Sequence, residues 1–336
     1  MDGGSAWGSV RKIRTLAQIM ALLEASASPK SNYAENLRAS LVKQHIALES
    51  ARMRGAQVGR SFDTIRMSLH ALTADNLSFL KKLRLVYVKE NKLVLSPASK
   101  RLLVQWRRGK ADIIRRRVLI RILSSDYKAY LRFLLNLERI GGSFTLIARG
   151  EKRTGESPLR ELLQDAGFKT DVASFFTLRD LFYDFRLVNF VTDKEGKFET
   201  LFLTCRIEAR DARQTGFRHQ VLVGRYRIGL DKRISSQSFC SMLIEGYKTL
   251  TPAWARWVSL LDLREAVTIR LRMADDDFDD ALLKVLKGHP CSGFRVDGSI
   301  GYGVSNRKYG EILKAKKMPL MPGNRPIQYV TISRRT

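Results

Sequence analysis

Two stretches of the sequence are close variants of each other: LRLVYV, residues 83–88, and FRLVNFV, residues 185–191. An apolar run precedes each copy, and a polar turn with an alternating segment follows it. Apolar residues at intervals of three or four predict a helix, and short Val-rich alternation predicts a strand. Each copy is therefore predicted to join a helix to a strand, and the chain is expected to repeat one structural unit.

The first copy lies within SFDTIRMSLHALTADNLSFLKKLRLVYVKENKLVLSPASKRLL, which begins at Ser61. Its apolar spacing predicts two short helices. Residues 86–88 are then predicted to form a strand, ENK a turn, LVL a second strand and SPASKRLL a closing helix. This order resembles the C-terminal half of a winged helix-turn-helix domain. The resemblance implies that the turn around Glu90 and Asn91 is the wing.

The second copy is preceded by three predicted helices, within YLRFLLNLERIGG, SPLRELLQDAG and DVASFFTLRDLFYDF, and followed by a wing turn at DKEG. Glycines close two of these helices, and Pro158 starts one at its first position. A third, similar unit is predicted from WVSLLDLREAVTIRLRMADDDFDDALLKVLKGHP, which contains two helices. The segments GFRVDGS and IQYVTISRR are expected to be its wing strands, on either side of a long excursion.

The predicted fold class is mainly α with small β-sheets (α+β), as tandem winged-helix units joined by a basic helix and a β-hairpin. The hairpin is expected within FETLFLTCRIEARDARQTGFRHQVLVGRYRIGL, with its turn at Thr215–Gly216. The expected divisions are a basic N-terminal unit (1–104), a basic connecting helix (105–124), a second unit with the hairpin (125–234) and a third unit with a basic tail (235–336).

The charge balance points to an anionic partner. The 336 residues include 60 Lys and Arg against 33 Asp and Glu, a net charge of +27. Such an excess repels itself, and nucleic acid is the usual partner that offsets it. Residues 1–125 carry 24 basic against 8 acidic residues, whereas residues 126–204 carry 12 of each. Only some units are therefore expected to contact phosphate, with DNA favoured over RNA because no stacking motif of the RRM type is present.

In a winged helix, the third helix enters the major groove and the wing contacts the backbone, so basic residues on these elements are candidate DNA contacts. The N-terminal unit and the adjoining basic segment meet this test, and the predicted hairpin and the C-terminal tail add further basic residues. The predicted nucleic-acid-binding residues are Arg60, Arg66, Lys81, Lys82, Arg84, Lys89, Lys92, Arg107, Arg108, Lys110, Arg115, Arg116, Arg117, Arg218, Arg225, Arg227, Lys314, Lys316 and Lys317.

The second and third units do not meet the same test. The presumed third helix of the second unit combines Asp171, Asp180 and Asp184 with five aromatic residues between Phe175 and Phe185. Those aromatics either pack inside or form a surface for a protein partner or self-association. The third unit has acidic residues from Asp275 to Asp280, where they favour the helix dipole and would repel a duplex.

No catalytic activity, cofactor or metal is expected. The four histidines are scattered, and no nucleophile elbow or phosphate-binding loop occurs. Carboxylates at one helix start fan outwards, so residues 275–280 are a poor magnesium site. Cys205, Cys240 and Cys291 are far apart without a CxxC pair and are expected to be small buried residues, with no disulfide framework. No membrane-spanning or signal segment is apparent, and a cytoplasmic (nucleoid-associated) or nuclear location is expected.

These features favour a non-catalytic double-stranded DNA-binding protein that grips the phosphate backbone with several basic surfaces along an extended duplex. The biological setting, whether replication, transcription, chromosome organisation, a mobile element or defence, stays open. The alternative is a scaffold subunit of a larger nucleoprotein complex. In that case the neutral units would dock protein partners, and the basic regions would hold DNA or RNA.

Overall fold

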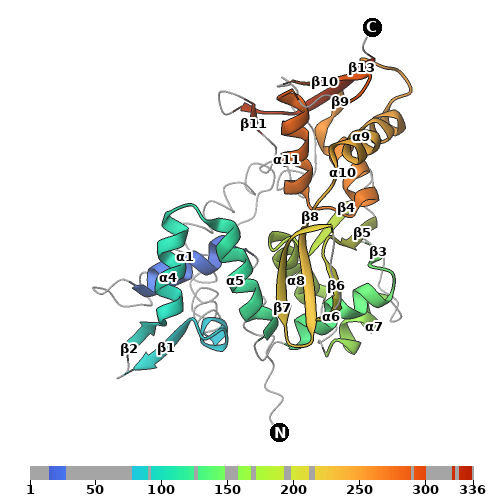
Figure 1. Ribbon diagram of the computed structural model, residues 1–336. Helices are drawn as coiled ribbons and strands as arrows, with labels where there is room; N and C mark the ends of the chain where they lie inside the picture. The colour runs from blue at the N-terminus through green and yellow to red at the C-terminus, as the bar shows by residue number, and fades with distance from the viewer. Residues whose placement is uncertain are drawn as a thin grey trace, which may run out of the picture. The chain divides into compact units, whose positions relative to one another are not determined.

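A computed structural model describes residues 15–27, 78–89, 92–124, 128–147, 158–167, 172–192, 198–211, 216–288, 291–299, 320–321 and 325–334. These residues form helices and small antiparallel sheets, which confirms the predicted α+β class (Figure 1). The predicted helices between Ser61 and residue 77 lie outside the described residues, as do the wing turns at residues 90–91 and 193–197.

The two copies of the repeated stretch have the same backbone conformation. The helices before them close with the same bond, from Leu83 N to Phe79 O and from Phe185 N to Leu181 O, each 3.0 Å long. The next residue is an arginine in the left-handed region in both copies, Arg84 at φ 54° and Arg186 at φ 57°. This conformation stops a helix and turns the chain, as glycine more commonly does. The predicted join from helix to strand is therefore confirmed in both copies.

The strands that follow the two joins are also paired alike. In the first copy β1 (Val86–Lys89) pairs with β2 (Lys92–Leu95), and in the second β4 (Val188–Thr192) pairs with β5 (Phe198–Leu203). One further hydrogen bond closes each pair at 3.0 Å, from Ser96 N to Leu85 O and from Thr204 N to Leu187 O. A hydroxyl side chain reinforces each closure, because Ser99 Oγ donates to Leu85 O and Thr204 Oγ1 donates to Arg186 O.

The first copy packs between helices from both sides of it in sequence. Helix α1 (Leu16–Ala27) contacts β2 and α4 (Pro97–Arg107), and α4 contacts α5 (Ala111–Ser124). Helix α4 begins as predicted, with Ser96 as N-cap and Pro97 in the first turn. The single connecting helix predicted over residues 105–124 is wrong: α4 ends at Arg107 and α5 begins at Ala111. Gly109 breaks the helix because its φ of 69° is left-handed.

Residues 128–203 contain helix, strand, helix, helix, strand, strand in that order. The elements are α6 (Lys128–Arg139), β3 (Ser143–Ile147), α7 (Pro158–Asp165), α8 (Val172–Asp184), β4 and β5. The sheet order is β3-β5-β4, so the first strand pairs with the last. The three helices and their glycine or proline boundaries were predicted from sequence.

Most of the described aromatic side chains of α8 and its end are in the core. Phe175, Phe182 and Phe185 are at most 1% exposed, and Phe182 meets Tyr130 and Phe133 of α6. These three rings are therefore not available to a protein partner. Asp184 is also engaged, since its Oδ2 accepts a 2.7 Å hydrogen bond from Leu16 N at the start of α1.

The hairpin predicted with a turn at Thr215–Gly216 is wrong. Strand β6 (Arg206–Ala209) and strand β7 (Phe217–Val223) lie on either side of that dipeptide, but both pair with β8 (Tyr226–Lys232), in the order β6-β8-β7. The tight turn is instead at Gly224–Arg225, where Gly224 has a φ of 57°. A two-residue turn with glycine at positive φ matches the twist of a β-hairpin.

Residues 236–334 repeat the order helix, strand, helix, helix, strand, strand. The elements are α9 (Ser236–Leu250), β9 (Val258–Ser259), α10 (Leu260–Leu271), α11 (Asp275–Leu286), β10 (Phe294–Ser299) and β13 (Tyr329–Arg334). The sheet order is β10-β13-β9, again with the first strand paired to the last (Figure 1). The predicted pairing of GFRVDGS with IQYVTISRR is confirmed. A short pair, β11 (Leu320–Met321) with β12 (Arg325–Pro326), lies within the excursion between them.

A buried cluster holds residues 236–334 together. It includes Phe239 of α9, Leu263 of α10, Phe278 of α11 and Ile332 of β13. A disulfide joins Cys240 of α9 to Cys291 before β10, whereas Cys205 is free and buried. The expectation of three unpaired cysteines was wrong because the two partners are 51 residues apart and only tertiary folding brings their Cα atoms to 5.4 Å.

The chain divides into two compact units. The first comprises residues 1–139, 153–185 and 221–226, and the second comprises residues 140–152, 186–220 and 227–336. Neither unit is one contiguous segment, so compactness does not test the contiguous divisions expected from the sequence.

Candidate nucleic-acid interface

The corner between α4 and α5 presents three basic residues to solvent. Arg107, Arg108 and Lys110 are all exposed, on either side of the left-handed Gly109. The corner is closed by Lys110 N donating to Gln105 O at 3.0 Å and Gly109 N donating to Trp106 O at 2.9 Å. Among the residues that the structure describes, one carboxylate pairs with this corner: Glu24 Oε1 is 3.9 Å from Arg107 Nε, and both side chains are exposed. Three cations on a fixed backbone corner suit phosphate binding.

The arginines of α5 differ in how far they are available. Arg115 is half-buried and donates to Asp112 Oδ1 at 2.6 Å, and Arg116 donates from Nε to Asp112 O at 3.3 Å. Arg117 is exposed and donates to Gln105 Oε1 at 3.2 Å. Arg121 donates to Leu83 O at 3.1 Å and so binds α5 to the first copy of the repeat. Of these four arginines, Arg117 is the best candidate for a phosphate contact, because its side chain is exposed to solvent.

Further exposed cations lie on the first strand pair and in the helix end and turn that precede it. Lys81, Arg84 and Lys89 are exposed and Lys82 is half-buried, while only the backbone of Lys92 is described. Tyr87 and Val88, between these cations on β1, are 44% and 51% exposed. Sequence reasoning assigned no role to Tyr87, because a strand of alternating residues gives no sign of which face is covered. Arg60, Arg66, Lys314, Lys316 and Lys317 lie outside the described residues.

Two of the three predicted arginines of the β7–β8 segment are exposed. Arg225 lies in the turn, with its Nε 3.1 Å from Tyr226 Oη, and Arg218 lies on β7. Arg227 instead uses its guanidinium internally, donating twice to Arg210 O and once to Gln220 Oε1. Arg227 therefore organises this three-stranded sheet, and Arg225 is the better candidate for phosphate.

The acidic start of α11 is engaged within the protein. Asn189 of β4 donates to Asp275 Oδ1 at 2.8 Å, and Arg186 pairs with Asp276 at 2.8 Å. Arg264 of α10, which is fully buried, donates to Asp279 Oδ2 at 2.9 Å. These carboxylates hold α11 against β4 and α10, a role that local sequence did not suggest. In the described part of the chain, no group of His, Cys, Asp or Glu has a metal-binding arrangement.

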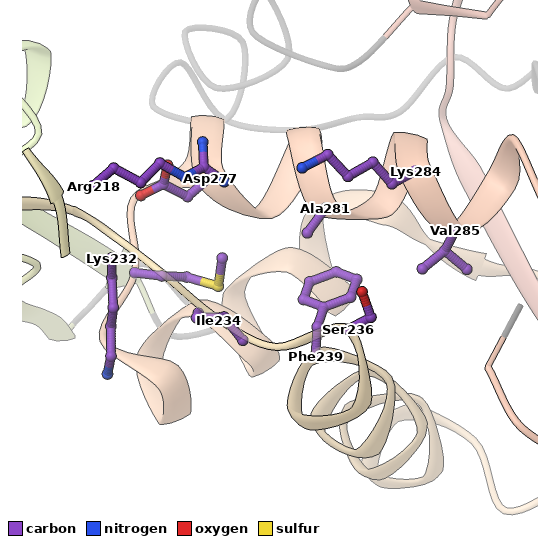
Figure 2. Close-up of a pocket in the computed structure, with 10 residues that line it drawn as sticks. Arg218, Lys232, Ile234, Ser236, Phe239, Asp277, Ala281, Lys284 and Val285 are labelled. Atoms are coloured by element: carbon purple, nitrogen blue, oxygen red, sulfur yellow. The ribbon is translucent and has the colours of Figure 1, made fainter. Parts of the chain in front are cut away.

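A pocket beside the first turn of α9 and along α11 is lined by three basic side chains and one buried acid. Figure 2 shows Arg218 next to Asp277, and Lys284 along the face of α11 above Phe239. Lys232 turns its ammonium away from Asp277 and donates to Leu271 O at 2.7 Å. Burial, with Arg272 and Arg206 nearby, lowers the pKa of Lys232.

Asp277 has an unusual environment for a carboxylate. It is 4% exposed, and no hydrogen-bond partner among the described residues reaches its Oδ1. Burial, reinforced by Asp231 and Asp276 and opposed by Arg186 and Arg218, raises the pKa of Asp277 to about 7. Burial also raises the pKa of Asp279 to about 8, although Arg264 opposes the shift. Below about pH 7, Asp277 therefore favours the protonated form in the folded protein.

We expect the free energy of unfolding to fall as pH rises from 5 to 8. Between the ordinary pKa of 3.8 and the raised value of about 7, the folded chain holds a proton on Asp277 that the unfolded chain has released. The stabilisation is therefore complete below about pH 4 and is lost as pH rises through 7. For Asp277 alone the loss between pH 5 and 8 is about 2–3 kcal/mol.

The measurement is urea unfolding at several pH values, compared with D277N. The amide cannot ionise, so the variant should show a shallower fall by the amount assigned to Asp277. Identical pH profiles for the two proteins would show that Asp277 has an ordinary pKa.

Comparisons with protein-family models, with curated protein sequences and with solved structures gave no match. None of the helices among the described residues is both long and apolar enough to cross a membrane.

Proposed function

We propose that this chain is a non-catalytic, double-stranded DNA-binding protein built from tandem winged-helix modules. The observation that carries the proposal is the recurrence of one element order and one strand pairing. Residues 128–203 and 236–334 each run helix, strand, helix, helix, strand, strand, and in each the first strand pairs with the last. Apart from the short β11–β12 pair in the second segment, this order and pairing support the assignment of a winged-helix topology to both segments. The shared join at Arg84 and Arg186 extends the likeness to the N-terminal module.

The basic residues favour DNA as the ligand of the N-terminal module. Exposed cations lie on or just before the β1–β2 strand pair, at the α4–α5 corner and on α5: Lys81, Arg84, Lys89, Arg107, Arg108, Lys110 and Arg117. The third helices of the other two modules, α8 and α11, instead direct carboxylates into the fold. We therefore assign DNA binding mainly to the N-terminal module and to Arg225, and a connecting role to the other two modules.

The scaffold alternative depended on exposed aromatic side chains in α8. Burial of Phe175, Phe182 and Phe185 weakens the support that exposed aromatic side chains would give it. Phosphate binding without base contacts gives affinity that is largely independent of sequence. We accordingly propose a protein that follows the duplex backbone.

The proposal is tested by fluorescence anisotropy with the full chain and matched DNA and RNA duplexes of about two helical turns, roughly 20 bp. We expect the DNA duplex to bind more tightly than the RNA duplex at the same salt concentration. Preference for the RNA duplex would reassign the ligand to RNA. Binding of neither duplex would reject the proposed function.

A further inference from the structure

The loop between α9 and β9 carries a group of aromatic and basic side chains that the proposed DNA interface does not use. Trp254 is stacked on Tyr247, with ring centroids 6.0 Å apart and planes at 16°, and its centroid is 5.1 Å from that of Phe294. Two cations lie over the same indole, Lys248 Nζ at 5.3 Å and Arg334 Cζ at 5.5 Å from the centroid. Three elements, α9, β10 and β13, thus meet at Trp254.

The backbone of this loop is fixed by hydrogen bonds. Tyr247 Oη donates to Arg256 O at 2.6 Å and accepts from Arg256 N at 2.9 Å. Ala255, whose φ is 59°, donates from N to Ile332 O of β13 at 2.9 Å. Residue 258 then enters β9, which pairs with β13. Trp257, between these fixed points, is held at a defined place on the surface.

Trp257 is the most exposed large hydrophobic side chain among the described residues, at 52%. Arg256 beside it is exposed, as are Lys248 and Arg334. None of these three cations forms an ion pair within the described part of the chain, although Glu245 is one turn before Lys248 on α9. Arg256 is next to the exposed indole of Trp257 in the chain, and Lys248 and Arg334 lie over the ring of Trp254 in the same loop. An exposed indole on a rigid loop that also holds cations suits a ligand that is both flat and anionic.

We propose that Trp257, with Lys248, Arg256 and Arg334, forms a second nucleic-acid site that binds unpaired bases of a single strand. Aromatic side chains bind single strands by stacking on the bases, while neighbouring cations contact the backbone. Bases within a duplex are already stacked on one another, so Trp257 selects single-stranded segments or overhangs over intact duplex. The site deepens the proposed function but uses residues distinct from those of the N-terminal interface.

The experiment measures anisotropy of the full chain with a labelled oligothymidylate and, separately, with a blunt DNA duplex at the same salt. W257A should weaken oligothymidylate binding by about 10- to 100-fold and change duplex binding by less than about twofold. W257F should keep most of the affinity, because a phenyl ring still stacks. I269A, which truncates another exposed hydrophobic residue of the same module, is the matched control and should change neither.

The outcomes separate this inference from the proposed function. Unchanged oligothymidylate binding by W257A, or equal losses on both ligands, would overturn the stacking site, while duplex binding by the wild-type chain would still support the proposed function. Competition by poly-glutamate that depends on Trp257 would overturn it in favour of an acidic peptide. Failure of duplex binding, together with Trp257-dependent binding of the single strand, would reject the proposed function and retain the site.

Discussion

Replacing Arg107, Arg108 and Lys110 together by alanine is expected to weaken duplex DNA binding on the order of 100-fold at physiological salt. Each phosphate contact contributes about 0.9 to the slope of log K against log salt, so the triple variant should also lower the magnitude of this slope by about 2–3. All three side chains are exposed at the α4–α5 corner, and Gly109 and the backbone bonds that form the corner are unchanged. The fold should therefore survive the substitution.

A matched control removes the same charge from positions where carboxylates already neutralise it. Arg139, Arg206 and Arg295 are exposed and paired with Asp165, Glu208 and Asp297 respectively. The variant R139A/R206A/R295A should retain DNA affinity within about threefold, because carboxylates already neutralise these three charges. Its fold should also be unaffected, since surface ion pairs contribute little to stability. Equal weakening by both triple variants would mean that net charge, and not the α4–α5 corner, determines binding.

The second large effect concerns stability. Arg264 is buried, with a side chain that is 1% exposed. Its Nη1 is 2.9 Å from Asp279 Oδ2, and its Nε is 3.9 Å from Asp275 Oδ2. R264A leaves two buried carboxylates without their cation. Removing one partner of a buried ion pair costs about 3–5 kcal/mol, and urea unfolding of the full chain should show a loss of that size.

Arg270 provides the comparison on the same helix, because it is exposed near the end of α10. R270A should change the free energy of unfolding by less than about 0.5 kcal/mol. The variant R264M/D275N/D279N, which removes the charges together, should recover most of the lost stability. A loss below about 1 kcal/mol for R264A would show that the buried carboxylates do not require Arg264.

Local sequence signals predicted the elements whose partners are near in the chain or strongly patterned. Ser96 and Pro97 predicted the start of α4, and the repeated LRLV and FRLV stretches predicted two equivalent helix–strand joins. Residues 294–299 and 329–334 were expected to be the wing strands of a third unit, and they pair across the intervening excursion. In each case the signal is a cap, a turn or a period that belongs to a single element.

Features that depend on distant partners were not predictable in this way. Asp184 caps α1 across 168 residues, and Asn189 binds Asp275 across 86. Strand β8 became the centre of its sheet although the sequence favoured a simple hairpin, because strand order is decided by tertiary pairing. Arg227 was predicted from sequence to bind phosphate, yet it donates to a backbone carbonyl within the fold. The proposed Trp257 site was not predicted from sequence, because its cations are on separate segments: α9, the loop between α9 and β9, and β13.

The central claim is that several exposed cations of this chain bind the phosphates of double-stranded DNA. The dependence of duplex affinity on salt concentration tests it most directly, because the slope of log K against log salt counts the phosphates that are neutralised. At least six contacts would give a slope of about −5 or steeper for the wild-type protein. A slope shallower than about −2 would contradict the claim, because it would mean that fewer than about three phosphates are bound.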